Sequence, residues 1–71
     1  MNKPEAGQAV QYYVVIVETA EDRVVKRMGP RNTRREAERI EAGAERNLNH
    51  ERFHVEIIDS NHPLATAEVA A

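Results

Sequence analysis

Residues 50–54 read HERFH and carry the side chains best suited to chemistry. They fit the pattern H-E-x-x-H, in which two histidines on one face of a helix hold zinc and the glutamate acts as general base. The surrounding sequence favours a strand instead, because apolar residues alternate directly through the pattern. In a strand, residues four apart lie about 13 Å apart, too far to share one ion. We therefore expect His50, Glu51 and His54 to match the pattern by chance without forming a zinc site, and we predict no metal and no cofactor.

Other catalytic sets are missing from the sequence. There is no cysteine, Ser60 is the only serine, and the three glycines are scattered rather than gathered in a phosphate-binding loop. Most carboxylates alternate with arginines, which is typical of a solvated, salt-bridged surface. We expect a protein that is not an enzyme, with a zinc enzyme of the H-E-x-x-H type as a further alternative.

The composition sets the class of protein that must position these residues. The chain has 71 residues and a formal net charge of -2, with 10 Lys plus Arg against 12 Asp plus Glu. That length allows one domain, and the lack of cysteine excludes disulfides. No apolar run is long enough to span a membrane, and we read no signal peptide. We therefore expect a cytoplasmic protein.

Two strands open the domain. Residues 1–9 lack periodicity and predict a disordered arm. Residues 10–18, VQYYVVIVE, are rich in β-formers and apolar on both alternating faces, so they predict a central strand covered on both sides. Residues 23–28 predict a second strand after a polar turn. If the turn spans residues 19–22, Val24, Lys26 and Met28 share a face with Tyr13, Val15 and Val17. A turn one residue longer places them beside Tyr12, Val14 and Ile16 instead.

A helix and a third strand follow. Gly29 and Pro30 should end the second strand, and Thr33 with Glu36 forms a capping box at the start of a helix that we expect over residues 33–48. Residues 53–59, FHVEIID, predict the last strand, with its odd-numbered apolar residues facing the helix. Residues 60–71 predict a flexible tail or a short helix near Pro63, capped by Ser60 or Asn61.

These elements predict a single α+β domain of type ββαβ over residues 10–59. The helix is long enough to return the chain across the sheet, so the third strand pairs with the first and the sheet order is 2-1-3. One helix covers one face only. We expect a homodimer on the other face, with an interface of Tyr13, Val15, Val17 and Ile58, although the roles of the two faces of the first strand could be exchanged. The alternative is that residues 63–69 fold back over that face.

A basic segment spans residues 23–35, which contain five arginines, one lysine and no acidic residue. Arginines in the first helical turn oppose the helix dipole, so an anion such as nucleic-acid phosphate would be favoured there. The candidate contacts are Arg27, Arg31, Arg34 and Arg35. Against this, Arg34 has Glu38 on its own helix face, and acids such as Glu18, Glu21 or Asp22 could neutralise the second strand across the sheet.

Three motifs within residues 12–59 resemble a group of short, uncharacterised proteins from actinobacteria and their phages. They are Gly29 with Pro30, the helical REAER of residues 35–39, and the NLNHERF of residues 47–53. The resemblance implies a phage setting and a host or phage protein as partner, without implying a reaction. A looser likeness to the DNA-binding arm domain of tyrosine recombinases is weakened because that fold has three strands before its helix. We expect a non-enzymatic, homodimeric binding module, with nucleic-acid binding as the alternative.

Overall fold

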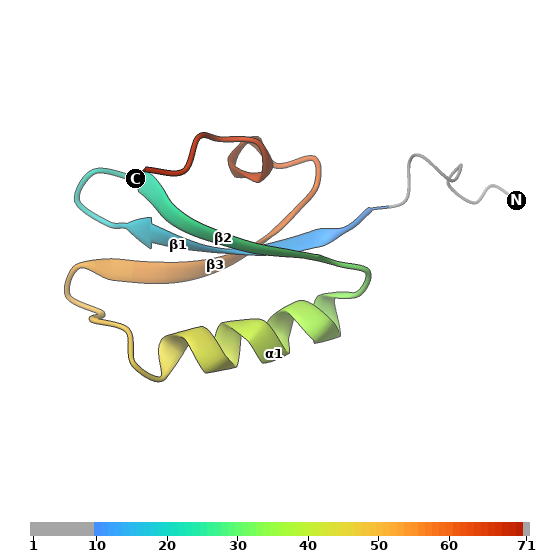
Figure 1. Cartoon of the computed structure of the whole chain (residues 1–71), viewed down its shortest axis with the longest axis horizontal. Helices are drawn as coiled ribbons and strands as arrows, with labels where there is room; N and C mark the ends of the chain where they lie inside the picture. The colour runs from blue at the N-terminus through green and yellow to red at the C-terminus, as the bar shows by residue number, and fades with distance from the viewer. Residues whose placement is uncertain (1–9, 71) are drawn as a thin grey trace, which may run out of the picture.

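The computed structural model describes residues 10–70, which form a sheet covered on both faces. The elements are β1 (Tyr12–Glu18), β2 (Arg23–Arg31), α1 (Arg34–Glu45), β3 (Phe53–Asp59) and a 3-10 helix, η2 (Pro63–Ala65). The strands lie in the order β2-β1-β3, with β1 antiparallel to both neighbours. Helix α1 packs on one face of the sheet, and the chain after β3 crosses the opposite face (Figure 1). The α+β class and the 2-1-3 order are confirmed. The arm predicted for residues 1–9 lies outside the described residues.

Strand β1 is buried from both sides, as its two apolar faces predict. Its even-numbered residues share the α1 side with Val55 and Ile57 of β3, whereas its odd-numbered residues share the opposite side with Ile58. Val14 on the first side and Val15 on the second are both fully buried. The predicted orientation of β3 is therefore confirmed.

The hairpin of β1 and β2 uses both registers that the sequence left open. Next to the turn, Val17 lies opposite Val24, so Val24 faces away from α1. A bulge follows, after which Ile16 lies opposite Lys26, so β2 is shifted by one residue from Lys26 to Met28. Lys26 and the later Met28 therefore fall on the α1 side.

Strand β2 also runs further than expected, through Gly29 and Pro30 to Arg31. Gly29 has a φ of +116°, which favours glycine, and a Cβ placed there would lie 2.9 Å from the carbonyl oxygen of Tyr12. The Gly29–Pro30 peptide bond is cis. These two residues do not end the strand, because the glycine lets the chain stay close beside β1 through a second register shift.

Helix α1 begins where the capping box places it and ends earlier than predicted. The Thr33 side chain accepts a hydrogen bond from the Glu36 amide, and the Glu36 carboxylate accepts one from the Thr33 amide. The helix ends at Glu45 and not at residue 48. Beyond it, Asn49 accepts backbone bonds from Arg52 and Phe53 and so builds the turn into β3.

Residues 60–70 form an ordered cover and not a flexible tail. Pro63 is at the start of η2 as predicted, but the cap is His62, whose Nδ1 accepts the Leu64 amide at 3.0 Å. Ala65 is buried in the same cluster as Val15 and Ile58. The alternative in which residues 63–69 fold back over the sheet is the one that the structure adopts.

Candidate interaction surface

The face expected to meet a second copy is occupied by the chain itself. Val15 and Val17 are 0% exposed and Ile58 is 4% exposed, while Tyr13 is half-buried against the same cluster. The segment 60–70 supplies the cover through Leu64, Ala65 and Ala67. The homodimer interface expected at Tyr13, Val15, Val17 and Ile58 is therefore wrong in this structure. A short apolar segment provides the cover that the sequence assigned to a partner.

An arginine holds that cover in place. Arg27 lies opposite Val15, on the face away from α1. Its Nη1 donates to the carbonyl oxygens of Ala67 at 2.6 Å and Leu64 at 3.3 Å. The amide of Ala70 also donates to the carbonyl oxygen of Val24 at 2.8 Å, at the outer edge of β2. Arg27 therefore satisfies backbone groups of the C-terminal segment.

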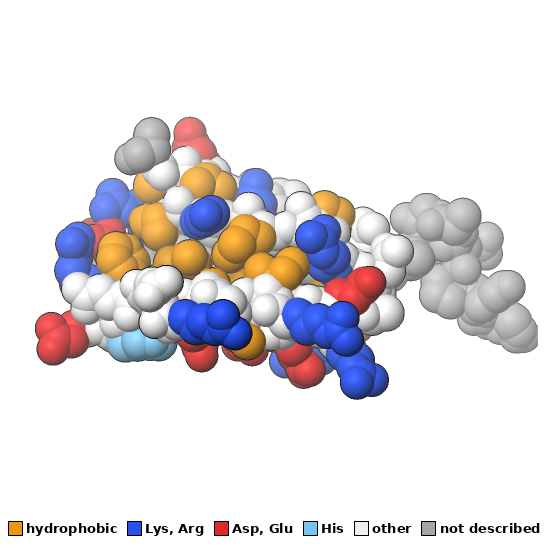
Figure 2. All heavy atoms as spheres, turned by 60° about the horizontal axis from the view of Figure 1, so that its bottom comes forward, with side chains coloured by type: hydrophobic (Ala, Val, Ile, Leu, Met, Phe, Trp, Pro, Cys, Tyr) orange, Lys and Arg blue, Asp and Glu red, His pale blue; other side chains and the backbone are white. Residues whose placement is uncertain are grey.

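The sheet face toward α1 is covered less completely. Among residues 10–70, only Val14 and Ala37 are fully buried on this side, because the helix presents a narrow stripe in which Ala37 and Ala44 are small. Ile16, Met28 and Ile40 are half-buried, and Figure 2 shows hydrophobic side chains gathered in a band beside the helix. We call these three residues the helix-side strip. Exposed apolar surface of this kind marks interaction sites on small proteins more often than apolar residues scattered singly do.

The four arginines named as nucleic-acid contacts lie on two sides of the sheet. Arg27 is on the side of the C-terminal segment, whereas Arg34 and Arg35 begin α1 on the opposite side. Arg34 Nε lies 3.6 Å from a Glu38 carboxylate oxygen, the ion pair predicted along the helix. Arg31 donates to the carbonyl oxygen of the adjacent Pro30. The basic segment therefore does not fold into one surface.

The H-E-x-x-H residues lie in a turn and a strand, as their context predicts. His54 is in β3, where Nδ1 lies 2.9 Å from Thr19 Oγ1 and Nε2 lies 2.7 Å from a Glu56 carboxylate oxygen. His50 and Glu51 lie in the turn before β3, and His50 Nε2 is 3.3 Å from the Glu45 carbonyl oxygen. Within residues 10–70, no three His, Cys, Asp or Glu side chains come together in an arrangement that could hold a metal ion.

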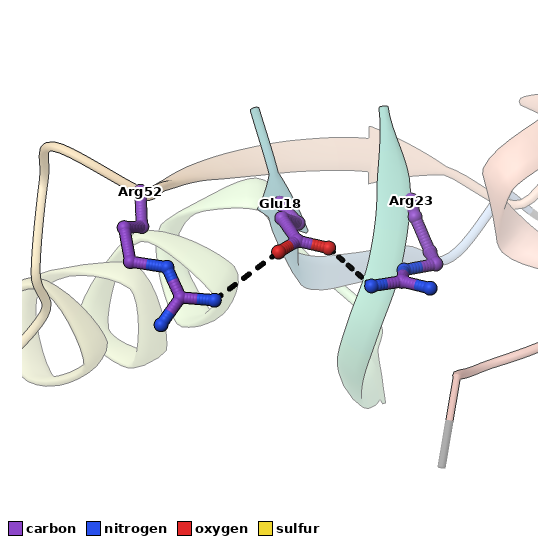
Figure 3. A network of polar contacts seen from close by, with 3 residues as sticks. All are labelled: Glu18, Arg23 and Arg52. Atoms are coloured by element: carbon purple, nitrogen blue, oxygen red, sulfur yellow. Dashed lines mark hydrogen bonds and ion pairs between the residues drawn. The ribbon is translucent and has the colours of Figure 1, made fainter. Parts of the chain in front are cut away.

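Glu18 is the centre of a charged cluster at the turn end of the sheet. Its carboxylate lies between Arg23 of β2 and Arg52 before β3 (Figure 3), with Arg52 Nη2 at 3.3 Å. Its side chain is only 14% exposed. The hydrogen bond from Arg23 is the main cause that lowers the pKa of Glu18, and Arg52 acts in the same direction. Of the three acids that could neutralise the second strand, Glu18 is the one that pairs with a basic residue of β2 within residues 10–70.

Two surface features were missed by reasoning from sequence. One is the helix-side strip, which depends on the β2 bulge. The other is the outer edge of β3, which the strand order places at the border of the sheet. The sequence of β3, with no Lys, Pro or Gly, carried a signal for it, since natural edge strands are commonly protected by Lys, Pro or bulges.

Comparison with known proteins adds no relative. No protein-family model, no curated protein and no solved structure matches the chain. Among the described residues, no helix has the length and apolar character needed to cross a membrane.

Proposed function

We propose that this protein is a non-enzymatic binding module that acts through protein–protein contacts as a homo-oligomer in the cytoplasm of its host. The observation that carries the proposal is the helix-side strip. Ile16, Met28 and Ile40 come from three separate elements and leave apolar surface partly exposed on one side of the sheet. Burying such surface against a partner is favourable by about 25 cal/mol per Å².

The resemblance to short actinobacterial and actinobacteriophage proteins supports a phage setting, with a host or phage protein as partner. The separation of the arginines supports protein over nucleic acid. Arg27 already donates to two carbonyl oxygens within the chain, so it has less to offer a phosphate.

The test is affinity capture from an actinobacterial lysate with and without nuclease. We expect wild-type protein to capture a specific protein that survives nuclease treatment. Met28→Glu should lose it, because a carboxylate would have to be desolvated at the contact. Ala42→Glu is the matched control, because it adds the same charge at an exposed position of α1.

Two results would contradict the proposal. Capture that disappears with nuclease would favour the nucleic-acid alternative. Equal capture by Met28→Glu and Ala42→Glu would mean that the helix-side strip is not the contact. Circular dichroism of both variants checks that each is folded.

A further inference from the structure

The two edges of the sheet differ in how well they are protected. The edge at β2 has a bulge, a proline without an amide hydrogen, and a bond from the Ala70 amide to the Val24 carbonyl oxygen. The edge at β3 has none of these devices, and its pairing with β1 has no register shift. A regular, unprotected edge is a template for another strand.

The hydrogen-bond pattern shows which β3 groups point outward. The Ser60 amide donates to the Gln11 carbonyl oxygen, and the Thr19 amide donates to the Arg52 carbonyl oxygen. Both bonds join directly opposite residues at the two ends of the β1–β3 pair. Hydrogen-bonded and non-hydrogen-bonded pairs alternate in antiparallel strands. Residues 54, 56 and 58 therefore bond to β1, and residues 53, 55, 57 and 59 turn their backbone groups outward.

Part of this outward row is already satisfied. The Phe53 amide donates to the Asn49 carbonyl oxygen, and the Asp59 carbonyl oxygen accepts from the His62 amide. Within residues 10–70, both backbone groups of Val55 and of Ile57 have no intramolecular partner. The open stretch is centred on these two residues.

We infer that β3 pairs antiparallel with β3 of a second copy, with Val55 opposite Val55 at the two-fold axis. This interface rests on the proposed function, since it specifies the homo-oligomer. It would join two three-stranded sheets into one continuous sheet, with β3 next to β3 at its centre. The occupant is a second copy because the edge is complementary to itself in one register.

Side chains select that register. With Val55 at the axis, His54 of each copy lies opposite Glu56 of the other, at positions where side chains approach most closely. On the α1 side, Phe53 lies opposite Ile57. Polar residues thus meet polar residues on one side, and apolar residues meet apolar residues on the other.

The neighbouring registers are less favourable. An axis at Glu56 places two carboxylates directly opposite each other and sets Phe53 against Asp59. Like charges in directly opposed positions destabilise a strand pair. An axis at His54 places two histidines opposite each other and shortens the overlap. A register shifted by an odd number of residues would place outward-pointing backbone groups of one β3 opposite inward-pointing groups of the other. No hydrogen-bond ladder would then form between the two strands.

Disulfide formation between single engineered cysteines tests the register of the β3–β3 pair directly, because the chain contains no cysteine of its own. In the proposed pairing, Val55→Cys brings two thiols across the axis, where the Cα atoms lie about 5.5 Å apart, within the range of a disulfide. Glu56→Cys places its two thiols on residues offset along the strands, beyond the limit of about 7 Å. Under mild oxidation Val55→Cys should form a covalent dimer at least tenfold faster than Glu56→Cys.

Sedimentation of the wild-type protein at several concentrations accompanies the cross-linking. A dimer at high micromolar concentration together with fast Val55→Cys cross-linking supports the inference. Faster cross-linking of Glu56→Cys would overturn the register. A strict monomer would overturn the interface whatever the variants do. Capture of a partner through the helix-side strip is measured separately, so a monomer that still captures its partner refutes this interface and leaves protein binding intact.

Discussion

At the scale of single residues, Glu18 has the clearest electrostatic role. Its carboxylate binds Arg23 and Arg52, and these contacts lower its pKa in the folded state. The unfolded chain therefore binds more protons than the folded chain at acidic pH, so Glu18 stabilises the fold above the ordinary glutamate pKa of about 4.3. That contribution is lost as the pH falls through the lower pKa of the folded state.

Glu18→Gln should accordingly lower the free energy of unfolding at pH 7 and flatten its fall toward acid. Urea unfolding followed at a series of pH values between neutral and acid measures both effects. Glu21→Gln is the control, since Glu21 is exposed and makes no ion pair with any described Arg or Lys. A Glu18→Gln variant with the wild-type acid dependence would contradict this assignment.

Two glycines should respond in opposite directions to the same substitution. Gly29→Ala meets both an unfavourable φ and the Tyr12 carbonyl oxygen, so it should destabilise the protein by about 1–3 kcal/mol. Gly43 is within α1 and a Cβ there would meet nothing within 4 Å. Gly43→Ala should therefore stabilise the protein by about 0.5–1 kcal/mol. Thermal and urea unfolding of the two variants give the comparison, and destabilisation by Gly43→Ala would contradict it.

These residues also show where sequence reasoning reaches its limit. The capping box of Thr33 and Glu36 was predictable because its contacts lie within one helical turn. The conformation of Gly29 was not, because it depends on the neighbouring strand, and local sequence alone predicts that Gly29 and Pro30 end β2. The contact between Glu18 and Arg52 joins residues far apart in sequence, and only the sheet order brings them together.

At the scale of elements, the least expected structure is the C-terminal segment. Its sequence has no long apolar run. The segment covers the sheet with the help of Arg27 from β2, which donates to its carbonyl oxygens. Charged donors to carbonyl oxygens form stronger hydrogen bonds than neutral ones. A segment that is weak by its own propensity can therefore be ordered by tertiary contacts.

Arg27→Ala should release this segment. Two carbonyl oxygens lose a charged donor, so the free energy of unfolding should fall by about 1–3 kcal/mol. Hydrogen exchange of the Ala70 amide, which is bonded to Val24, should become faster. Arg31→Ala is the control, because the Arg31 side chain is exposed and donates to the carbonyl oxygen of the adjacent Pro30 and to no other described residue, so its effect should stay within about 0.5 kcal/mol. Equal effects of the two substitutions would show that Arg27 does not hold the segment.

An element can be predicted from sequence when the contacts that determine it join residues close together in the chain. The bounds of β3 and the start of α1 were predicted because local patterns determine them. The bulge in β2 was not, since either hairpin register satisfies the same alternation. The sequence leaves two alternatives for the cover of the second face, because a second copy and a folded-back segment bury the same apolar residues.

At the scale of the whole molecule, the covered face changes where an oligomer can form. The small size of the chain favours an additional source of stability, because domains of about 60 residues bury a limited fraction of their surface. The C-terminal segment provides part of it on one face. Among residues 10–70, the helix-side strip and the edge of β3 stay available for contact with another chain. These two surfaces do not overlap with the buried cluster around Val15.

Pairing through the β3 edge couples stability to protein concentration. If the folded dimer is the stable species, mass action raises the midpoint of thermal unfolding as the concentration rises. Val55→Pro should abolish this dependence, because proline removes the outward amide at the axis while the bonds between residues 54, 56 and 58 and β1 remain. Glu56→Pro is the contrasting variant, since it removes an amide that bonds to β1, and it should lose the fold at every concentration. Scanning calorimetry from low to high micromolar concentration separates the three proteins. A wild-type midpoint that does not move with concentration would contradict the coupling, and a Val55→Pro midpoint that moves as the wild type does would place the contact elsewhere.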